Sequence, residues 1–313
     1  MPFQLRPYFP PVFSTPALEN APDAVFRPAP RDGMAPENFH AMSIFPEYFK
    51  IAGQWHLARE SRMDCVAVWD RGRSDVREFG RLRQGDLVAV GRTEQGEEGI
   101  LVHPDGFRER RVARDVFAFR QGRSRETAFS RDYDELYELL RHERDHGKVV
   151  WVMGPAFAFD HDARNAFSRL IAGGFVHSVL AGNALATNDL EASYLNTAHG
   201  QNNNTQESQT NRHYGPLPPV LADVYAAQDA MRAEIRSATT VICMATALHT
   251  IAAGNMTPSY RVLADGTVRL VYFYCVDISE FAVNKLSDRG SLSARGIITN
   301  VQDFIVHLSK ELI

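Results

Sequence analysis

Two apolar runs in succession, each ending in a turn of small residues, constrain the fold of this chain most strongly. The run VVWVM over residues 149–153 ends at Gly154, and a second run over residues 176–180 ends at Gly182. Each run indicates a buried strand that stops where a helix begins. In open α/β sheets, ligands bind in the crevice beyond the carboxyl ends of the strands. Two such strand ends therefore predict a nucleotide site.

Strands and helices alternate along the second part of the chain. A helical face formed by Tyr133, Leu136, Tyr137 and Leu140 comes first. The strands that follow are predicted at residues 149–153, 176–180, 240–245, 270–276 and 296–298, and the helices at 162–172, 189–196, 219–236, from about 248, at 279–286 and at 301–308. Such alternation predicts parallel βαβ units with helices on both faces. We therefore expect a doubly wound, Rossmann-like α/β domain over residues 126–313.

The first 125 residues have a different pattern. Nine of the sixteen prolines lie within residues 1–36. Proline fixes φ and removes a donor, so we expect an extended arm without regular helix or central strand, either disordered or draped over a partner. Its aromatic residues favour the draped arrangement. Residues 37–125 predict a small antiparallel, β-rich domain, because short apolar runs bounded by turns occur at 64–69, 87–90, 100–102 and 112–119.

Composition excludes several classes of protein. The net charge of −4 argues against a dedicated nucleic-acid binder, which carries a basic excess. The three cysteines, Cys65, Cys243 and Cys275, fit no disulfide framework. No run approaches the ~18 apolar residues of a membrane span, and the N-terminus lacks a signal pattern. We expect a cytoplasmic chain with no membrane partner. The histidines show no ligand-like spacing, so we expect no metal.

Four candidate loops follow the predicted strands, at Gly154-Pro155-Ala156, at Gly182-Asn183-Ala184, over residues 246–255 and at Asp277. Backbone amides at helix N-termini bind phosphate, and an acidic residue at a strand tip often holds a ribose diol. Each loop taken alone is better explained by a plain turn, and Asp277 by an N-cap. Four such loops on one sheet edge favour a nucleotide site, although the GxGxxG fingerprint is absent.

Other polar residues have two readings each. His249 could donate to a phosphate or act as acid or base near neutral pH, or it could merely cap or pack. Asp189, just past Gly182, could take part in catalysis or serve only the helix dipole. The turn from Asp288 to Ser291 could bind a ligand or form a structural ion pair.

Several stretches resemble a known family. AGNALATNDLEAS, GPLPPVLADVYAAQDAMR, ALHTIAAGNMTPS and CVDISEFAVNKLSDRGS are similar to the C-terminal half of the LOR/SDH-domain proteins, and SRMDCVAVWD and LRQGDLVAVG to their N-terminal domain. That family includes the archaeal NAD-dependent ornithine cyclodeaminases and the C-terminal part of the cyanobacterial arginine dihydrolase/ornithine cyclodeaminases. The likeness covers roughly residues 40–313.

The resemblance implies a β-rich LOR/SDH-type domain beside a deoxyhypusine-synthase-like domain that binds NAD. It also implies conversion of ornithine to proline and ammonia. NAD takes a hydride from the α-carbon, the δ-amine closes the ring, ammonia leaves, and the same NADH reduces the cyclic imine. By motif, the catalytic candidates are Asp64, Cys65, Asp189 and His249. The implied cofactor contacts are Gly154, Pro155, Gly182, Asn183, Ala184, His249, Gly254, Asn255, Asp277, Asp288, Arg289, Gly290 and Ser291.

The chain departs from the family at residues 201–214. Family members carry some dozens of extra residues there, including a strand–helix unit, where this chain has QNNNTQESQTNRHY. Three hypotheses therefore stay open: an ornithine cyclodeaminase-like enzyme, a related oxidoreductase with net hydride transfer on another amino acid, and a non-catalytic NAD-binding homologue. We expect an amino-acid substrate and a homo-oligomer.

Overall fold

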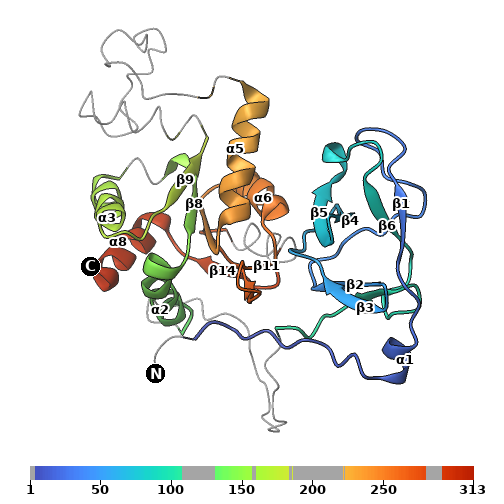
Figure 1. The fold of residues 1–313 in the computed structure, drawn as a ribbon. Coiled ribbons are helices and arrows are strands. Elements are labelled where there is room, and N and C mark those ends of the chain that lie inside the picture. The colour runs from blue at the N-terminus through green and yellow to red at the C-terminus, as the bar shows by residue number, and fades with distance from the viewer. Residues whose placement is uncertain are drawn as a thin grey trace.

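The computed structural model describes residues 4–107, 131–156, 160–182, 185, 221, 223–279 and 291–313. Figure 1 shows a β-rich part, residues 4–107, beside a layered α/β part, which takes the described residues from 131 to 313. The strand predicted at 112–119, the helix predicted at 189–196 and the polar stretch 201–214 lie outside the described residues, as does nearly all of the helix predicted at 279–286.

The α/β part is built on a five-stranded sheet. Its strands are β8 Val149–Met153, β9 Ser178–Ala181, β10 Thr240–Met244, β13 Tyr272–Asp277 and β14 Ala294–Ile298. Their spatial order is β14-β13-β10-β8-β9, and every neighbouring pair is parallel. Every residue of β8 and β10 is buried, because helices cover this sheet on both faces. The predicted parallel sheet is confirmed, but β9 is a half-exposed edge strand and not the buried strand that we expected.

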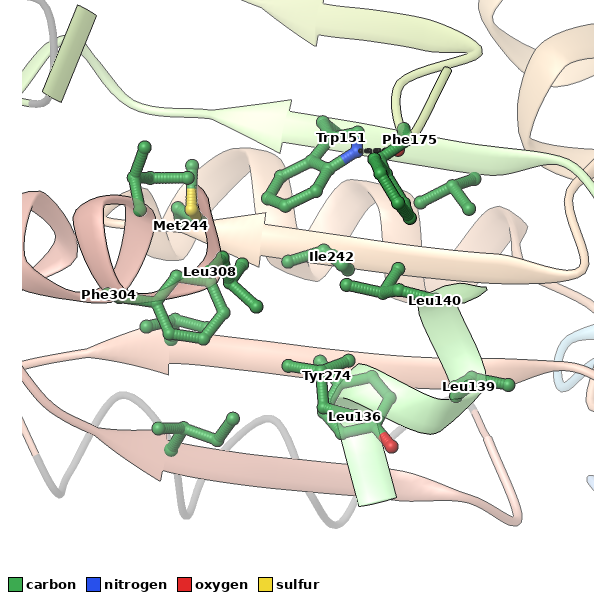
Figure 2. Close-up of a cluster of buried hydrophobic side chains, with 14 of the residues drawn as sticks. Leu136, Leu139, Leu140, Trp151, Phe175, Ile242, Met244, Tyr274, Phe304 and Leu308 are labelled. Carbon is green, nitrogen blue, oxygen red and sulfur yellow. Dashed lines mark hydrogen bonds between the residues drawn. The ribbon is translucent and has the colours of Figure 1, made fainter. Parts of the chain in front are cut away.

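The described helices of this part divide between the two faces of the sheet (Figure 1). They are α2 Arg131–His146, α3 His161–Ala172 and α8 Val301–Leu312 on one face, and α5 Val224–Ser237 and α6 Ala247–Met256 on the other. Figure 2 shows the first face, where the indole of Trp151 donates to the carbonyl of Phe175 at 3.1 Å. The doubly wound arrangement is confirmed. Within the described ranges, no helix is both long and apolar enough to cross a membrane.

The strand predicted over residues 270–276 is present from Tyr272 onward, but its start is wrong. The structure has a hairpin of β11 Tyr260–Val262 with β12 Val268–Leu270, and then a break at Val271 before β13 begins. The amide of Val271 donates to the carbonyl of Ser259 at 3.0 Å, which directs the chain from the hairpin into the parallel sheet. The apolar run continues across the break because both sides of it are buried, so periodicity gave no sign of it.

The β-rich part is antiparallel, as predicted, and contains two sheets. The first has the order β1-β6-β4-β5 and the second β3-β2-β7. The strands of the first are β1 Val25–Pro28, β6 Leu87–Val90, β4 Cys65–Asp70 and β5 Arg73–Glu78, which the 3-10 turn η1 Phe79–Arg81 follows. Those of the second are β3 Gln54–Leu57, β2 Glu47–Ile51 and β7 Ile100–Val102. Our sequence analysis missed β2, β3 and β5, whose charged and polar residues interrupt the apolar pattern.

The proline-rich arm packs against the β-rich part of the same chain. The hydroxyls of Tyr8 and Tyr48 are 2.6 Å apart, and the ring of Phe13 stacks on Trp55 with centroids 5.6 Å apart. The arm also contains a single helical turn, α1 Pro16–Glu19, and the edge strand β1. These elements correct the expectation of an arm without helix, and they suit proline, which is tolerated in a first turn and at a sheet edge.

A buried lysine fastens this arm. The ammonium of Lys50 donates to the carbonyl oxygens of Leu18, Glu19 and Ala21 at 3.3, 2.7 and 2.8 Å. These carbonyls belong to the end of α1 and the turn after it, where a helix leaves acceptors unpaired. One side chain therefore satisfies them and holds the turn against β2.

We expect replacement of Lys50 by methionine to loosen the arm. The change keeps an unbranched apolar stem and removes three charge-assisted hydrogen bonds, so the free energy of unfolding should fall by about 1.5–3 kcal/mol. Limited proteolysis should also cut faster between residues 14 and 24. Urea denaturation and mass spectrometry of the fragments measure both effects. The control is Lys310→Met on the exposed end of α8, expected within about 0.5 kcal/mol of the parent. Equal behaviour of the two variants would contradict this account.

Candidate functional site

The order of the strands reverses between β8 and β10. From β8 the chain passes through α3 to β9 on one side, and later builds β10, β13 and β14 on the other side. The helices that follow β8 and β10, which are α3 and α6, consequently lie on opposite faces of the sheet. Doubly wound sheets bind their ligands at this reversal, beyond the carboxyl ends of the strands. This edge is the candidate functional site.

Gly154 follows β8 and lies directly against the residue that follows β10. Its amide donates to the carbonyl of Met244 at 2.8 Å, and a Cβ at Gly154 would overlap the carbonyl oxygen of Ala245. Ala245 is itself in the left-handed region, at φ 49°. The two strand ends thus meet backbone to backbone. Their packing requires a glycine at 154 irrespective of any ligand beyond it.

His249 lies in the first turn of α6 and contacts the end of a different strand. Its Nδ1 is 2.7 Å from the hydroxyl of Thr246, the N-cap residue of α6. A Cβ at Gly182, which follows β9, would lie 2.8 Å from Cε1 of the imidazole. The ring therefore spans from the end of β10 to the end of β9, across β8. Sequence reasoning selected both residues, and the structure brings them into contact.

Asp277 ends β13 at the same edge of the sheet. The amide of Ala245 donates to the carbonyl of Val276 at 3.0 Å, which joins this strand end to the one beside it. One carboxylate oxygen of Asp277 accepts from the amide of Ser279 at 2.8 Å. The side chain therefore orders its own turn, and it is half-buried at the site.

Other predicted cofactor contacts lie elsewhere. Residues 247–256 form α6, so only Thr246 remains of the loop that we expected over residues 246–255. Gly254 and Asn255 lie in the last turn of this helix, away from the strand ends. Ser291 precedes β14, and its hydroxyl donates to the carbonyl of Val271 at 3.2 Å, at the amino end of the sheet. Pro155 follows Gly154 after the end of β8, at the carboxyl edge of the sheet. Outside the described residues are Asn183, Ala184, Asp189, Asp288, Arg289 and Gly290.

The two residues expected on the substrate side lie at the start of β4. Asp64 is exposed, in a left-handed turn with φ 60°. Cys65 is 1% exposed and packs in the core of the β-rich part. Burial raises the pKa of its thiol to about 11, with Arg62 acting in the opposite direction. Nothing in the described structure brings either residue to the carboxyl edge of the parallel sheet.

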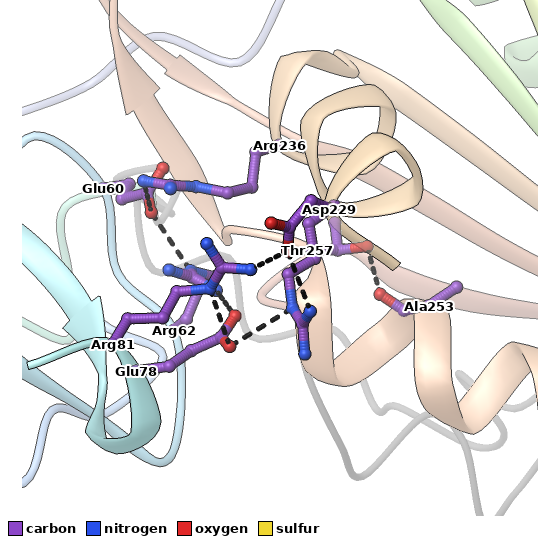
Figure 3. A network of polar contacts seen from close by, with 9 residues as sticks. Glu60, Arg62, Glu78, Arg81, Asp229, Arg236, Ala253 and Thr257 are labelled. Atoms are coloured by element: carbon purple, nitrogen blue, oxygen red, sulfur yellow. Dashed lines mark hydrogen bonds and ion pairs between the residues drawn. The ribbon is translucent and has the colours of Figure 1, made fainter. Parts of the chain in front are cut away.

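A network of charges near Cys65 joins the β-rich part to α5 (Figure 3). Arg62 is 2% exposed and donates to Glu60 at 3.0 Å and to Glu78 at 2.9 Å. Arg236 of α5 donates to the same Glu60 at 2.8 Å. Burial acts to lower the pKa of Arg62, but the carboxylates around it raise that pKa overall.

Sequence reasoning missed this network. Glu60 and Arg236 are 176 residues apart, and no periodic pattern links such positions. Among the described residues no three His, Cys, Asp or Glu side chains form a metal-binding group. The expectation of no metal stays a prediction.

A family model matches the α/β part. The model of the family described as "Arginine dihydrolase ArgZ-like, C-terminal, Rossmann fold" matches residues 135–214 and 208–308. The two matched pieces meet at residues 208–214, within the stretch where our sequence analysis found the chain shorter than its family.

Curated relatives and a solved structure match nearly the whole chain. The chain is 32% identical to an ornithine cyclodeaminase of Archaeoglobus fulgidus over 88% of this chain and 76% of that protein. It is 30% identical to the Methanopyrus kandleri ornithine cyclodeaminase, over 91% of this chain and 77% of that one. A putative LOR/SDH protein from Methanococcus maripaludis S2 superimposes with a TM-score of 0.73 at 27% identity, covering 93% of this chain and 98% of that one.

We expect Gly154→Ala to destabilise the fold because its Cβ overlaps the backbone of Ala245. Overpacking against backbone costs about 1–3 kcal/mol, and urea denaturation measures it. The matched control is Gly80→Ala, where a Cβ meets no atom within 4 Å. We expect that variant to stay within about 0.5 kcal/mol of the parent. If both variants are equally stable, the two strand ends are not in backbone contact.

We expect the thiol of Cys65 to resist alkylation in the folded protein. Because its pKa is raised from 9.0 to about 11, the thiol stays neutral below that pH. The neutral thiol reacts slowly, since the thiolate is the nucleophile. At pH 8 this shift alone should slow the reaction with iodoacetamide about 100-fold relative to the unfolded chain, and the rate should rise as the pH approaches 11. Peptide mass spectrometry measures the rate. Fast alkylation of the folded protein at pH 7 would show that this thiol is ionised and accessible.

Proposed function

This chain belongs to the family of the ArgZ-like proteins and the archaeal ornithine cyclodeaminases, and we propose that it is an NAD-dependent ornithine cyclodeaminase. It would convert ornithine to proline and ammonia. The names of its archaeal relatives support this proposal, because the chain covers about three quarters of their length and the likeness extends through both of its parts.

The single observation that carries the proposal is the position of His249 at the reversal of the strand order. The hydroxyl of Thr246 holds Nδ1 of the imidazole, and Gly182 leaves the ring its space. A hydroxyl both donates and accepts, so Thr246 can support either tautomer. Nε2 can then hold a proton or accept one, which are the two states that general acid–base transfer requires.

The residues at this edge fit a dinucleotide. The side chain of Thr246 makes no bond to the first amides of α6, because its hydroxyl contacts the imidazole of His249 instead. Amides of the first helical turn are therefore available to an anion at the positive end of the helix dipole. Asp277, on the neighbouring strand, presents a half-buried carboxylate that suits a ribose hydroxyl. We propose that Thr246 to His249 hold the pyrophosphate of NAD and that Asp277 holds a ribose.

NAD, when bound, supplies a reversible hydride acceptor for the α-carbon of the amino acid. Ornithine contains the atoms of proline plus one ammonia, so the overall reaction has no net change in oxidation state. The protein's own task is to orient the amino acid, exclude water and move protons. We propose that Nε2 of His249 takes up a proton from an amino group of the substrate and returns it to the departing ammonia.

Several expectations stay predictions. They are the cofactor and catalytic roles of the individual site residues, the domain boundaries at residues 36 and 125, the homo-oligomeric state and the cytoplasmic location. We keep them as part of this proposal, with a small-molecule amino acid as the substrate and no nucleic-acid partner.

The experiment combines cofactor release with turnover. We expect the purified protein, after denaturation, to release NAD. We also expect the folded protein to form proline and ammonia from ornithine without accumulating NADH. His249→Ala should lower kcat by about 10²–10⁴-fold, the range of general acid–base catalysis. The control is His146→Ala, an exposed histidine at the far end of α2.

The outcomes separate the three hypotheses. Net formation of NADH would identify an oxidoreductase that acts on another amino acid. Bound NAD with no product from any basic amino acid would leave a non-catalytic homologue. If no nucleotide is released and NAD does not stabilise the fold, the proposed site is wrong.

A further inference from the structure

A cavity of about 300 Å³ lies where the β-rich part meets α5 and β11. Its charged and polar lining consists of Arg59, Glu60, Asp75, Arg236, Ser237 and Arg261. Arg236 and Ser237 end α5, immediately before β10 begins, so the cavity lies at the amino end of the parallel sheet. The proposed NAD site lies at the carboxyl end. The two are therefore separate.

The charges that line this cavity are not balanced. Glu60 accepts from both Arg62 and Arg236, so one carboxylate serves two guanidinium groups. The carboxylate of Asp75 lies 3.8 Å from Nε of Arg77, a residue that does not line the cavity. Among the described residues no carboxylate comes within ion-pair distance of Arg59 or Arg261, although Arg261 donates to the carbonyl of Ser237 at 2.8 Å.

The like charges also raise each other's energy. Burial lowers the pKa of Arg261, the attraction of Glu60 opposes this lowering, and the repulsion of Arg236, Arg269 and Arg59 adds to it. A second cavity of about 340 Å³ shares Arg59 and Asp75 with the first and adds Asp70, Arg71 and Arg73. A bound anion would neutralise charges that the described protein groups leave uncompensated.

We propose that this cavity is a binding site for a small oxyanion, a carboxylate or phosphate group, held by Arg59, Arg236 and Arg261. Guanidinium groups bind both kinds of anion through paired N–H donors. The volume matches the lower range of small-molecule sites. Arg59 belongs to the β-rich part, and Arg236 and Arg261 belong to the α/β part, so the bound anion bridges the two and stiffens their junction.

Thermal unfolding of the full chain tests this site. The probes are inorganic phosphate and succinate, each titrated at constant ionic strength set by chloride. We expect at least one of them to raise Tm along a saturable curve, since a ligand of the folded state stabilises it. Comparison of the phosphate and succinate titrations shows whether a phosphate or a carboxylate is preferred. Chloride alone should give no saturable rise.

Two variants locate the effect. Arg59→Ala removes an exposed guanidinium and should weaken anion binding by about tenfold or more. Arg83→Ala, the control, removes an exposed arginine of the same β-rich part that lines neither cavity, and should leave the titration curve unchanged. Arg261→Lys keeps the charge but loses the planar fork, so we expect an intermediate affinity.

A saturable shift that Arg59→Ala abolishes and Arg83→Ala retains supports the site. Equal curves for Arg59→Ala and the parent would overturn it, as would the absence of any saturable shift with both anions. Ornithine turnover is not part of this readout, so failure here is distinct from failure of the proposed function.

Discussion

The burial of the parallel sheet on both faces is the constraint on which the rest of this structure depends. β8 and β10 present no exposed residue, and helices must therefore return over each face to cover them. With right-handed crossovers, covering both faces forces the strand order to reverse once. The reversal falls between β8 and β10. The candidate site is thus a consequence of how a wholly apolar strand is kept from water.

The junction between the two parts combines apolar packing, such as Phe107 against Tyr260, with a network of charges. Arg62 is buried, and such a charge is tolerated only while its partners remain, because loss of one partner of a buried ion pair costs about 3–5 kcal/mol. Its partners are Glu60 and Glu78, and Glu60 is in turn held by Arg236 of α5. Charged networks are directional, so this one fixes the orientation of the β-rich part relative to α5.

Patterns confined to one element were readable from the sequence. The apolar run of β8 and the helical face of α2 each depend on neighbours a few residues away, and both are confirmed. Gly154, Gly182, His249 and Asp277 were also placed at one edge, because parallel strands end on the same side.

The failures have a common physical cause, which is dependence on distant partners. Ser291 matched a family motif, but sequence proximity to β13 does not say at which end of the sheet a residue lies. Lys50 lies within a strand and is buried only because the carbonyls of a segment about thirty residues earlier surround its ammonium. No local pattern records such a contact.

The arm has a thermodynamic consequence that its contacts with β2 alone do not suggest. At one end, the amide of Arg6 donates to the hydroxyl of Tyr272, at the start of β13, at 3.2 Å. At the other end, β1 pairs with β6 in the first antiparallel sheet. The same short segment therefore belongs to both parts, and neither can open fully without releasing it. We therefore expect the arm to couple the unfolding of one part to that of the other, although the two parts are built on different sheets.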